Sequence, residues 1–188
     1  MSDPVHPRRR FLHRAGAAAL ATGLLPLAPQ PALAALAALP GAHALSFDNL
    51  HTGERLSTVF AIGDTFVPQA LQSLNHLLRD HYSGQVGNMD PQLFGLLFRL
   101  RQALGTDEPF QVISGFRSPA TNARLRQTGG GGVARRSLHM DGQAIDIRLA
   151  GVPLAELRDA ALSLQGGGVG FYEKEQFVHV DTGRVRAW

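Results

Sequence analysis

Apolar residues recur at strand and helix spacings from about Leu45 to the end of the chain. Segment 44–61 contains two partly alternating apolar runs joined at Thr52-Gly53-Glu54, which predicts a β-hairpin. Segment 69–81 places leucines on one face of a helix. A folded domain is therefore expected to begin near Leu45.

A helix with well-defined ends is predicted next. Asp90 is a suitable N-cap, Pro91 suits the first helical position, and Gly105 ends the periodic segment. Its apolar stripe consists of Leu93, Leu96, Leu97, Leu100 and Leu104. The remaining segments predict, in order, a strand at 109–116, a helix at 120–127, a strand at 142–149, a helix at 152–164, and strands at 169–172 and 177–182.

The mixture of helices and strands lacks a regular strand–helix–strand rhythm, which favours the α+β class. We expect one domain over residues 45–188, built on a small, mostly antiparallel sheet flanked by helices. The four glycines at 129–132 precede neither a Gly-Lys-Ser/Thr sequence nor a helix, so they indicate a surface loop rather than a phosphate-binding loop.

Residues 1–44 have the composition of an export signal: basic residues, then an apolar stretch with small-residue cleavage sites. The run RRRFL (8–12) resembles a twin-arginine signal, which exports proteins already folded. We expect cleavage after Ala34 or after Ala44, and a periplasmic mature protein. The alternative is an uncleaved membrane anchor, which the prolines within the apolar stretch disfavour.

Charge and cysteine content narrow the function classes. The formal net charge is +3, but four of the 18 Lys and Arg and one of the 15 Asp and Glu lie in residues 1–44, so the remaining chain holds 14 of each. A nucleic-acid binder is expected to carry a basic folded domain, so this class is disfavoured. Because cysteine is absent, a metal site must use histidine and carboxylate ligands.

A carboxylate within an apolar run is the first candidate for chemistry. Asp146 lies between two isoleucines, so on a strand it points away from both. A buried carboxylate is costly unless hydrogen bonds or a cation compensate its charge. His179 and Asp181 share one face of a later strand, and His139 lies just upstream of the strand of Asp146. If the two strands are neighbours, their polar faces meet.

Two imidazoles and one carboxylate are a common catalytic zinc set that leaves a fourth position open for water. Imidazole also suits copper, iron or nickel, so the residue types favour zinc without singling it out. The alternative is a structural His–Asp hydrogen bond beneath the sheet. The other six histidines are expected to be surface or hydrogen-bonded residues: His6, His13, His43, His51, His76 and His81.

Several blocks of the sequence together carry a family resemblance. They are SGFRSPATNARLR, SLHMDGQAIDIRL, GGVGFY and FVHVDTGRVRAW, preceded by LSFDNLHTGE and LNHLLRDH. In this order they resemble the YcbK-like exported murein peptidases, within the group of D-Ala-D-Ala metallopeptidases related to lysostaphin and the hedgehog signalling domain. The resemblance covers essentially all of residues 45–188, and it implies the hedgehog/D-Ala-D-Ala peptidase type of fold.

The resemblance implies that Zn²⁺ is bound by His139, Asp146 and His179, through the family pattern S-x-H-x(6)-D and a distal H-x-D. It also implies hydrolysis of peptidoglycan stem-peptide crosslinks, by an endopeptidase more than by a carboxypeptidase, and we expect a monomer with one zinc ion. Arg117 matches an arginine that relatives use near the substrate, where it would bind a carboxylate or stabilise negative charge. Its alternative role is to start the following helix or to anchor the loop.

The general base is not evident. Relatives place a Glu or a second His shortly before the last zinc-binding histidine, whereas here Phe177 occupies the H-x-H position and Glu175 lies outside the expected one. Asp181 is the first candidate to handle the proton. Its alternative role is to orient the imidazole of His179. The alternative function is a non-catalytic zinc-containing domain that binds peptidoglycan or a protein.

Overall fold

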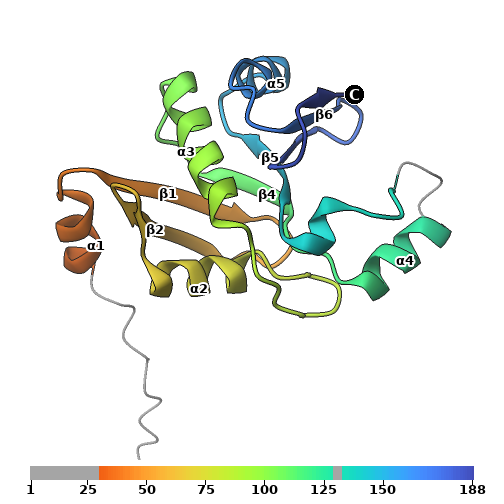
Figure 1. Ribbon diagram of the computed structural model, residues 1–188, viewed down its shortest axis with the longest axis horizontal. Coiled ribbons are helices and arrows are strands. Elements are labelled where there is room, and N and C mark those ends of the chain that lie inside the picture. The colour runs from red at the N-terminus through yellow and green to blue at the C-terminus, as the bar shows by residue number, and fades with distance from the viewer. Residues whose placement is uncertain (1–29, 129–132) are drawn as a thin grey trace, which may run out of the picture.

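The computed structural model describes residues 30–128 and 133–188, which form one sheet with helices packed around it (Figure 1). The strands are β1 (Ala42–Asn49), β2 (Arg55–Ile62), β3 (Thr65–Phe66), β4 (Phe110–Ser114), β5 (Ala144–Leu149), β6 (Gly168–Tyr172), β7 (Phe177–Asp181) and β8 (Arg186–Ala187). Their order is β3-β2-β1-β4-β5-β7-β6-β8. The pairs β1–β4 and β6–β8 are parallel and the other pairs are antiparallel. The α+β class is confirmed, and the short strands β3 and β8 enlarge the predicted sheet.

Three of the helices pack against the sheet and form the core with it. The helices are α1 (Gln30–Ala37), α2 (Pro68–Leu77), α3 (Pro91–Leu104), α4 (Pro119–Thr128) and α5 (Leu154–Ser163), with the 3-10 turn η1 (Leu138–Asp141). Leu74, Leu97 and Leu157 from α2, α3 and α5 join strand residues such as Phe47 and Ile147 in one buried cluster. Burying one such side chain stabilises the fold by about 1.5–3 kcal/mol. In Figure 1, α4 lies apart from α3 and α5, at the right-hand end.

Local sequence signals determine the hairpin and α3. β1 and β2 pair across the predicted turn, where Gly53 has φ +72°. The side chain of Asp90 accepts a hydrogen bond from the Gln92 amide at 2.9 Å, and Gly105 ends α3 in the left-handed conformation. Both elements are as predicted, because the residues that specify them are neighbours in the sequence.

α2 ends at Leu77, four residues before the end of the predicted helix. Beyond it, the Asp80 carboxylate accepts hydrogen bonds from the backbone amides of Tyr82 (2.9 Å) and Ser83 (3.4 Å). Such side-chain bonds compete with continuation of the helix. The same carboxylate accepts from the Ser118 amide at 2.9 Å, so it also fastens this turn to the segment after β4.

The predicted start of the domain can be compared with the first elements of the structure. β1 begins at Ala42, three residues before the expected start of the domain, and α1 lies inside the predicted leader. The twin-arginine run and the glycines at 129–132 lie outside the described residues. Within the described ranges, no helix has both the length and the apolar character needed to cross a bilayer.

Candidate metal centre

His139 is held in place by η1, just before β5. Its Nδ1 donates to the carbonyl oxygen of Gly115 at 2.7 Å, and its own carbonyl accepts from the Arg117 amide at 3.1 Å. Gly142 ends the turn at φ +68°, where a side chain would collide with the carbonyl oxygen of Asn88. Since Nδ1 carries the proton, Nε2 directs a lone pair into the site.

Asp146 and His179 lie directly opposite each other on the antiparallel strands β5 and β7. The residues that flank them belong to the core: Ile145, Ile147, Val178 and Val180. Both polar side chains therefore point to the opposite face of the sheet, as the alternation predicted. His179 Nδ1 lies 2.9 Å from Asp146 Oδ1.

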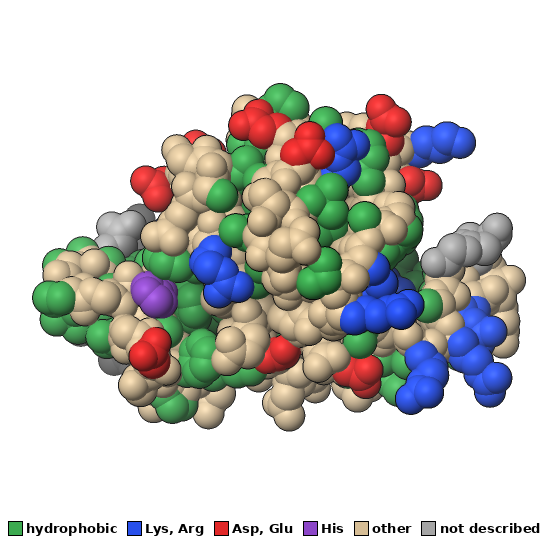
Figure 2. Space-filling model, turned by 45° about the horizontal axis from the view of Figure 1, so that its top comes forward, with side chains coloured by type: hydrophobic (Ala, Val, Ile, Leu, Met, Phe, Trp, Pro, Cys, Tyr) green, Lys and Arg blue, Asp and Glu red, His purple; other side chains and the backbone are tan. Residues whose placement is uncertain are grey.

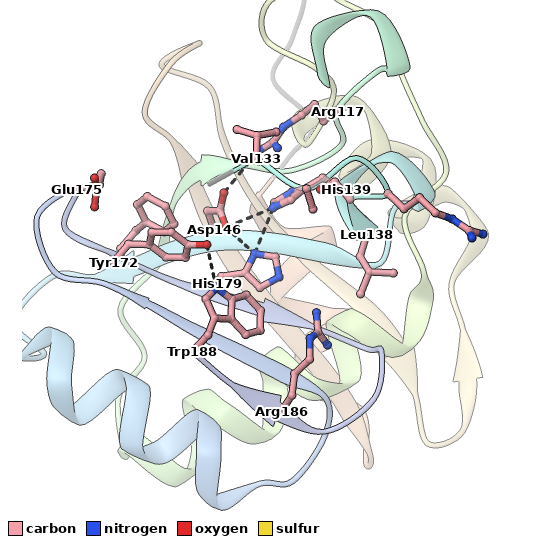
Figure 3. A pocket seen from close by; sticks show the side chains of 14 residues that line it. Arg117, Val133, Leu138, His139, Asp146, Tyr172, Glu175, His179, Arg186 and Trp188 are labelled. Atoms are coloured by element: carbon pink, nitrogen blue, oxygen red, sulfur yellow. Dashed lines mark hydrogen bonds and ion pairs between the residues drawn. The ribbon is translucent and has the colours of Figure 1, made fainter. Parts of the chain in front are cut away.

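Three donor atoms converge at this point: His139 Nε2, His179 Nδ1 and Asp146 Oδ1 (Figure 3). His139 Nε2 lies 3.3 Å from each of the other two atoms. Zinc at about 2.0–2.1 Å from such ligands in a tetrahedron would separate them by about 3.3 Å. The set of donors and its spacing therefore fit a tetrahedral metal ion.

The charge state of Asp146 also suits a ligand. Burial disfavours its charged form, but the imidazoles of His139 and His179 outweigh burial and hold the pKa of this carboxyl well below its usual range. Asp146 is therefore an anion at neutral pH. Two imidazole lone pairs and a carboxylate at these distances repel one another unless a proton or a cation lies among them.

Asp181 contacts the other nitrogen of the His179 ring. Its Oδ2 accepts from His179 Nε2 at 3.0 Å and from Arg186 at 2.7 Å, and its Oδ1 accepts from the backbone amides of Gly168 (3.0 Å) and Gly183 (2.8 Å). The residue has 0% exposure. Both oxygens are thus engaged on the side of the ring away from the donor cluster, where no substrate water can reach them.

The sequence left two roles open for Asp181, as general base and as the residue that orients His179, and this geometry bears on the choice between them. A base must reach the proton that it abstracts, directly or through one water. The second role considered for Asp181 is the one that its position favours. By accepting the Nε2 proton, it leaves Nδ1 of His179 free to bind a metal, which is the usual arrangement for a supporting carboxylate.

Arg117 follows β4 and lies above the donor cluster (Figure 3). Its guanidinium is 3.9 Å from Asp146 Oδ2 and 3.5 Å from the hydroxyl of Ser114. The side chain is 15% exposed. These are loose contacts for a group with five N–H donors, so Arg117 keeps hydrogen-bonding capacity for a substrate.

The donor cluster lies in a cavity of about 420 Å³. One wall is aromatic: the rings of Tyr172 and Phe177 stack at 4.5 Å, and Trp188 donates from Nε1 to the Tyr172 hydroxyl at 2.9 Å. The Trp188 ring centroid is 5.2 Å from that of His179. Glu175 also lines the cavity, from the β6–β7 turn.

Sequence patterns gave no role to Trp188, Tyr172 or Arg186. The first and last of these lie within the motif FVHVDTGRVRAW, but neither forms part of a recognisable spacing of ligands. The positions of Arg186 and Trp188 depend on the pairing of β8 with β6, where the Phe171 amide donates to the Trp188 carbonyl at 3.0 Å. Such a return is a tertiary feature without a local sequence signal.

Two histidines and an aspartate that converge in a cavity beside an α+β sheet are a donor set typical of metal-dependent hydrolases, and the family comparison places the chain among the metallopeptidases. The family model described as "Peptidoglycan L,D-endopeptidase MepK", of the M15 peptidases, matches residues 37–188. The chain belongs to this family.

Two relatives that are similar over nearly the whole chain agree with this assignment. The Peptidoglycan L,D-endopeptidase MepK of Escherichia coli K12 is 42% identical over 186 residues, which cover 99% of this chain and 100% of the relative. The Probable peptidoglycan L,D-endopeptidase MepK of Haemophilus influenzae is 42% identical over 182 residues, covering 96% and 95%. Among solved structures, the Serratia marcescens L-Ala D-Glu endopeptidase ChiX matches with 25% identity and a TM-score of 0.32, over 41% of this chain and 62% of that chain.

Proposed function

We propose that this protein is an exported, zinc-dependent peptidoglycan endopeptidase that cleaves stem-peptide crosslinks. The observation that carries the proposal is the convergence of His139, Asp146 and His179 on one point at 2.9–3.3 Å, at the floor of an accessible cavity. The relatives that share nearly the whole chain are named peptidoglycan L,D-endopeptidases, and their similarity supports peptidoglycan as the substrate class.

Zinc bound by these three residues would supply a water of lowered pKa and a Lewis acid for the scissile carbonyl. The residues around it have separate tasks. His139 donates a hydrogen bond to the Gly115 carbonyl, and His179 donates one to Asp181. These bonds leave the other ring nitrogen of each histidine free for the metal. Asp146 contributes the negative charge of the ligand set.

Arg117 is suited to the negative charge of the substrate. Its guanidinium lies beside the cluster and can donate to the carbonyl oxygen as charge develops there, or to a substrate carboxylate. The backbone amide of Arg117 donates to the carbonyl of His139, so the position of the guanidinium is coupled to that of His139.

With Asp181 enclosed, Glu175 is the candidate for proton transfer. Of the carboxylates in the described residues that line the cavity, Asp146 belongs to the donor cluster and Glu175 does not. Glu175 is exposed and lies on the turn between β6 and β7. A Glu175→Gln variant should keep its zinc and lose more than about 100-fold in kcat, the lower range for a general base.

The decisive experiment combines metal analysis with digestion of sacculi. Wild type should hold about one zinc per chain and convert crosslinked muropeptide dimers to monomers, as followed by mass spectrometry. His139→Ala should lose both properties, and the matched control His76→Ala, which changes an exposed histidine on α2, should keep both. If zinc-loaded wild type leaves the dimers intact, the protein is a binding domain and not a hydrolase.

A second readout follows metal binding without activity. Trp188 is the one tryptophan of the chain, and its ring lies 5.2 Å from the His179 ring. Binding of Co²⁺ or Cu²⁺ at this site should therefore quench its fluorescence. Zinc added first should prevent the quenching, and His139→Ala should abolish it.

The proposal of export includes removal of the leader upstream of Ala42. Cleavage after Ala44 would remove Ala42, His43 and Ala44, which pair with Ile62, Ala61 and Val59 of β2. It would also remove the stacking of His43 on Phe98 at 4.4 Å. Cleavage after Ala34 leaves β1 whole. The mass of the periplasmic protein distinguishes the two sites, and replacement of the arginine pair at 8–9 by lysines tests the twin-arginine route.

A further inference from the structure

A second cavity, of about 370 Å³, adjoins the one that contains the donor cluster. The two cavities share Arg117, Asp146, Glu175 and Phe177 as lining residues. They are therefore two lobes of one cleft that passes the candidate metal centre. A peptide whose scissile bond lies at that centre would place one side in each lobe.

Two stacked imidazoles form a wall of this second lobe. The rings of His51 and His81 lie 3.9 Å apart at an angle of 3°, and Tyr82 packs against His81 at 4.2 Å. The two histidines are 30 positions apart in the sequence, in the β1–β2 turn and in the loop after α2. Only the tertiary fold brings them together.

Buried polar residues fix both of these loops before any ligand arrives. The Asn49 side chain donates to the Leu77 carbonyl at 2.8 Å and accepts from the His51 amide at 3.0 Å. The Asp80 carboxylate accepts from the amides of Tyr82 and Ser118. The lobe is thus preorganised, which lowers the entropic cost of binding.

Two groups that line the lobe have unused hydrogen-bonding capacity. Nε2 of His81 is buried and has no hydrogen-bond partner among the described residues. Burial and the charges of His51, Arg117 and Arg124 lower the pKa of His81, so its ring is neutral at neutral pH. Arg117 makes only the loose contacts described above. Buried polar groups without partners are rare in proteins, and they point to a ligand or an ordered water.

The second lobe is lined by one arginine, Arg117, and by three carboxylates, of which Asp146 belongs to the donor cluster and Glu175 is exposed. The segment that contributes Arg117 is basic. Residues 109–140 contain no acidic residue and five arginines: Arg117, Arg124, Arg126, Arg135 and Arg136. Figure 2 shows basic side chains gathered at the right-hand end of the molecule, the end where α4 lies in Figure 1. The acid next to His81, Asp80, is buried and accepts backbone hydrogen bonds.

We propose that the His51–His81 lobe is a carboxylate-binding subsite, in which His81 Nε2 and the Arg117 guanidinium donate to one free carboxylate of the substrate. This inference rests on the proposed function, since the carboxylate belongs to a peptide bound across the metal centre. His51 takes no direct part and holds the His81 ring by stacking. The subsite makes the enzyme selective for crosslinked peptides that carry a free carboxylate on one side of the scissile bond.

The test uses zinc-loaded full-length mature protein and crosslinked muropeptide dimers, with free carboxylates either intact or converted to primary amides. Loss of a charge-assisted hydrogen bond should raise KM of wild type about 10- to 100-fold on the amidated dimers, with little change in kcat. His81→Phe, which keeps a ring to stack on His51, should raise KM for the intact dimers similarly and have little further effect on the amidated ones. His81→Gln should restore part of the loss, and His76→Gln is the matched control.

Equal KM values of wild type for the two substrates would overturn the subsite, as would a His81→Phe effect of the same size on both. Equilibrium binding of the intact and amidated dimers, measured by calorimetry, separates this result from failure of the proposed function. Binding that depends on the carboxylate but without cleavage supports the subsite and refutes the hydrolase. Cleavage that ignores the carboxylate supports the hydrolase and refutes the subsite.

Discussion

Asp146 and Asp181 contact opposite nitrogens of the same imidazole, at 2.9 Å from Nδ1 and 3.0 Å from Nε2 of His179. Both carboxylates are buried, and both have pKa values held well below the usual range in spite of that burial. Their surroundings differ. On the open side, Asp146 faces a second imidazole, a loosely held arginine and a cavity. On the closed side, Asp181 is surrounded by backbone amides and Arg186.

Burial and a lowered pKa therefore do not distinguish the candidate metal ligand, Asp146, from the carboxylate that supports His179. The difference lies in what the remaining oxygen lone pairs face. On the open side they face other electron-pair donors, so that a proton or a cation must lie between them, whereas on the closed side they face N–H donors, which satisfy them. The open side is therefore built to bind and the closed side to orient.

The largest expected effect comes from removing the charge on the open side. Asp146→Asn should lower activity by more than about 100-fold, beyond the range seen for supporting residues, and should abolish stoichiometric zinc binding. Metal analysis and muropeptide digestion measure the two losses. A variant that keeps its zinc would show that Asp146 is not a ligand, and a circular dichroism spectrum like that of wild type would exclude misfolding as the cause.

Asp181→Asn tests the closed side and should have a different signature. Zinc affinity should fall about 10- to 100-fold, because the His179 ring loses the acceptor that fixes its orientation. At saturating zinc, kcat should return to within a few-fold of the wild-type value. A kcat that stays low in excess zinc would restore the role of Asp181 as the general base.

The pH dependence of zinc affinity should reflect both sides of the ring. Burial opposes the imidazolium, but hydrogen bonds to Asp146 and Asp181 outweigh burial and raise the pKa of His179 above 6.5. Protons compete with zinc for His179 at pH values below that raised pKa. Zinc affinity should therefore be constant above this pKa and fall by up to about tenfold per pH unit below it. Asp181→Asn should move the fall to lower pH, and an unchanged profile would contradict the proposed pairing.

Replacing Arg186 should give the smallest effect. Its guanidinium reaches Asp181 at 2.7 Å and 3.1 Å, but the side chain is 30% exposed and two backbone amides also hold the carboxylate. Arg186→Gln should weaken zinc binding only a few-fold, below the range for the carboxylate itself. Titration with a chelator measures the change, and a loss as large as that of Asp181→Asn would show that the guanidinium is the main determinant.

Local patterns predicted several elements of the fold and the direction of two site residues. The Asp90 cap and Gly105 marked α3, the Thr-Gly-Glu turn marked the hairpin, and strict alternation placed Asp146 and His179 opposite the core. These predictions succeeded because each depends on residues a few positions apart. The end of α2 was predicted too late in the sequence. After Leu77, hydrogen bonds from backbone amides to the Asp80 carboxylate take the place of helical hydrogen bonds.

Patterns within the sequence indicated the class of fold, three residues with the chemistry of a metal site, and the face of each strand on which two of them lie. The tertiary structure decided that β5 and β7 are neighbours, that Asp181 is enclosed by Gly168, Gly183 and Arg186, and that His51 stacks on His81. Periodicity specifies the direction of a side chain relative to its own strand. It contains no information about which distant segment packs against that side chain. The neighbouring segments are what distinguish Asp146, which faces the cavity, from Asp181, which is enclosed.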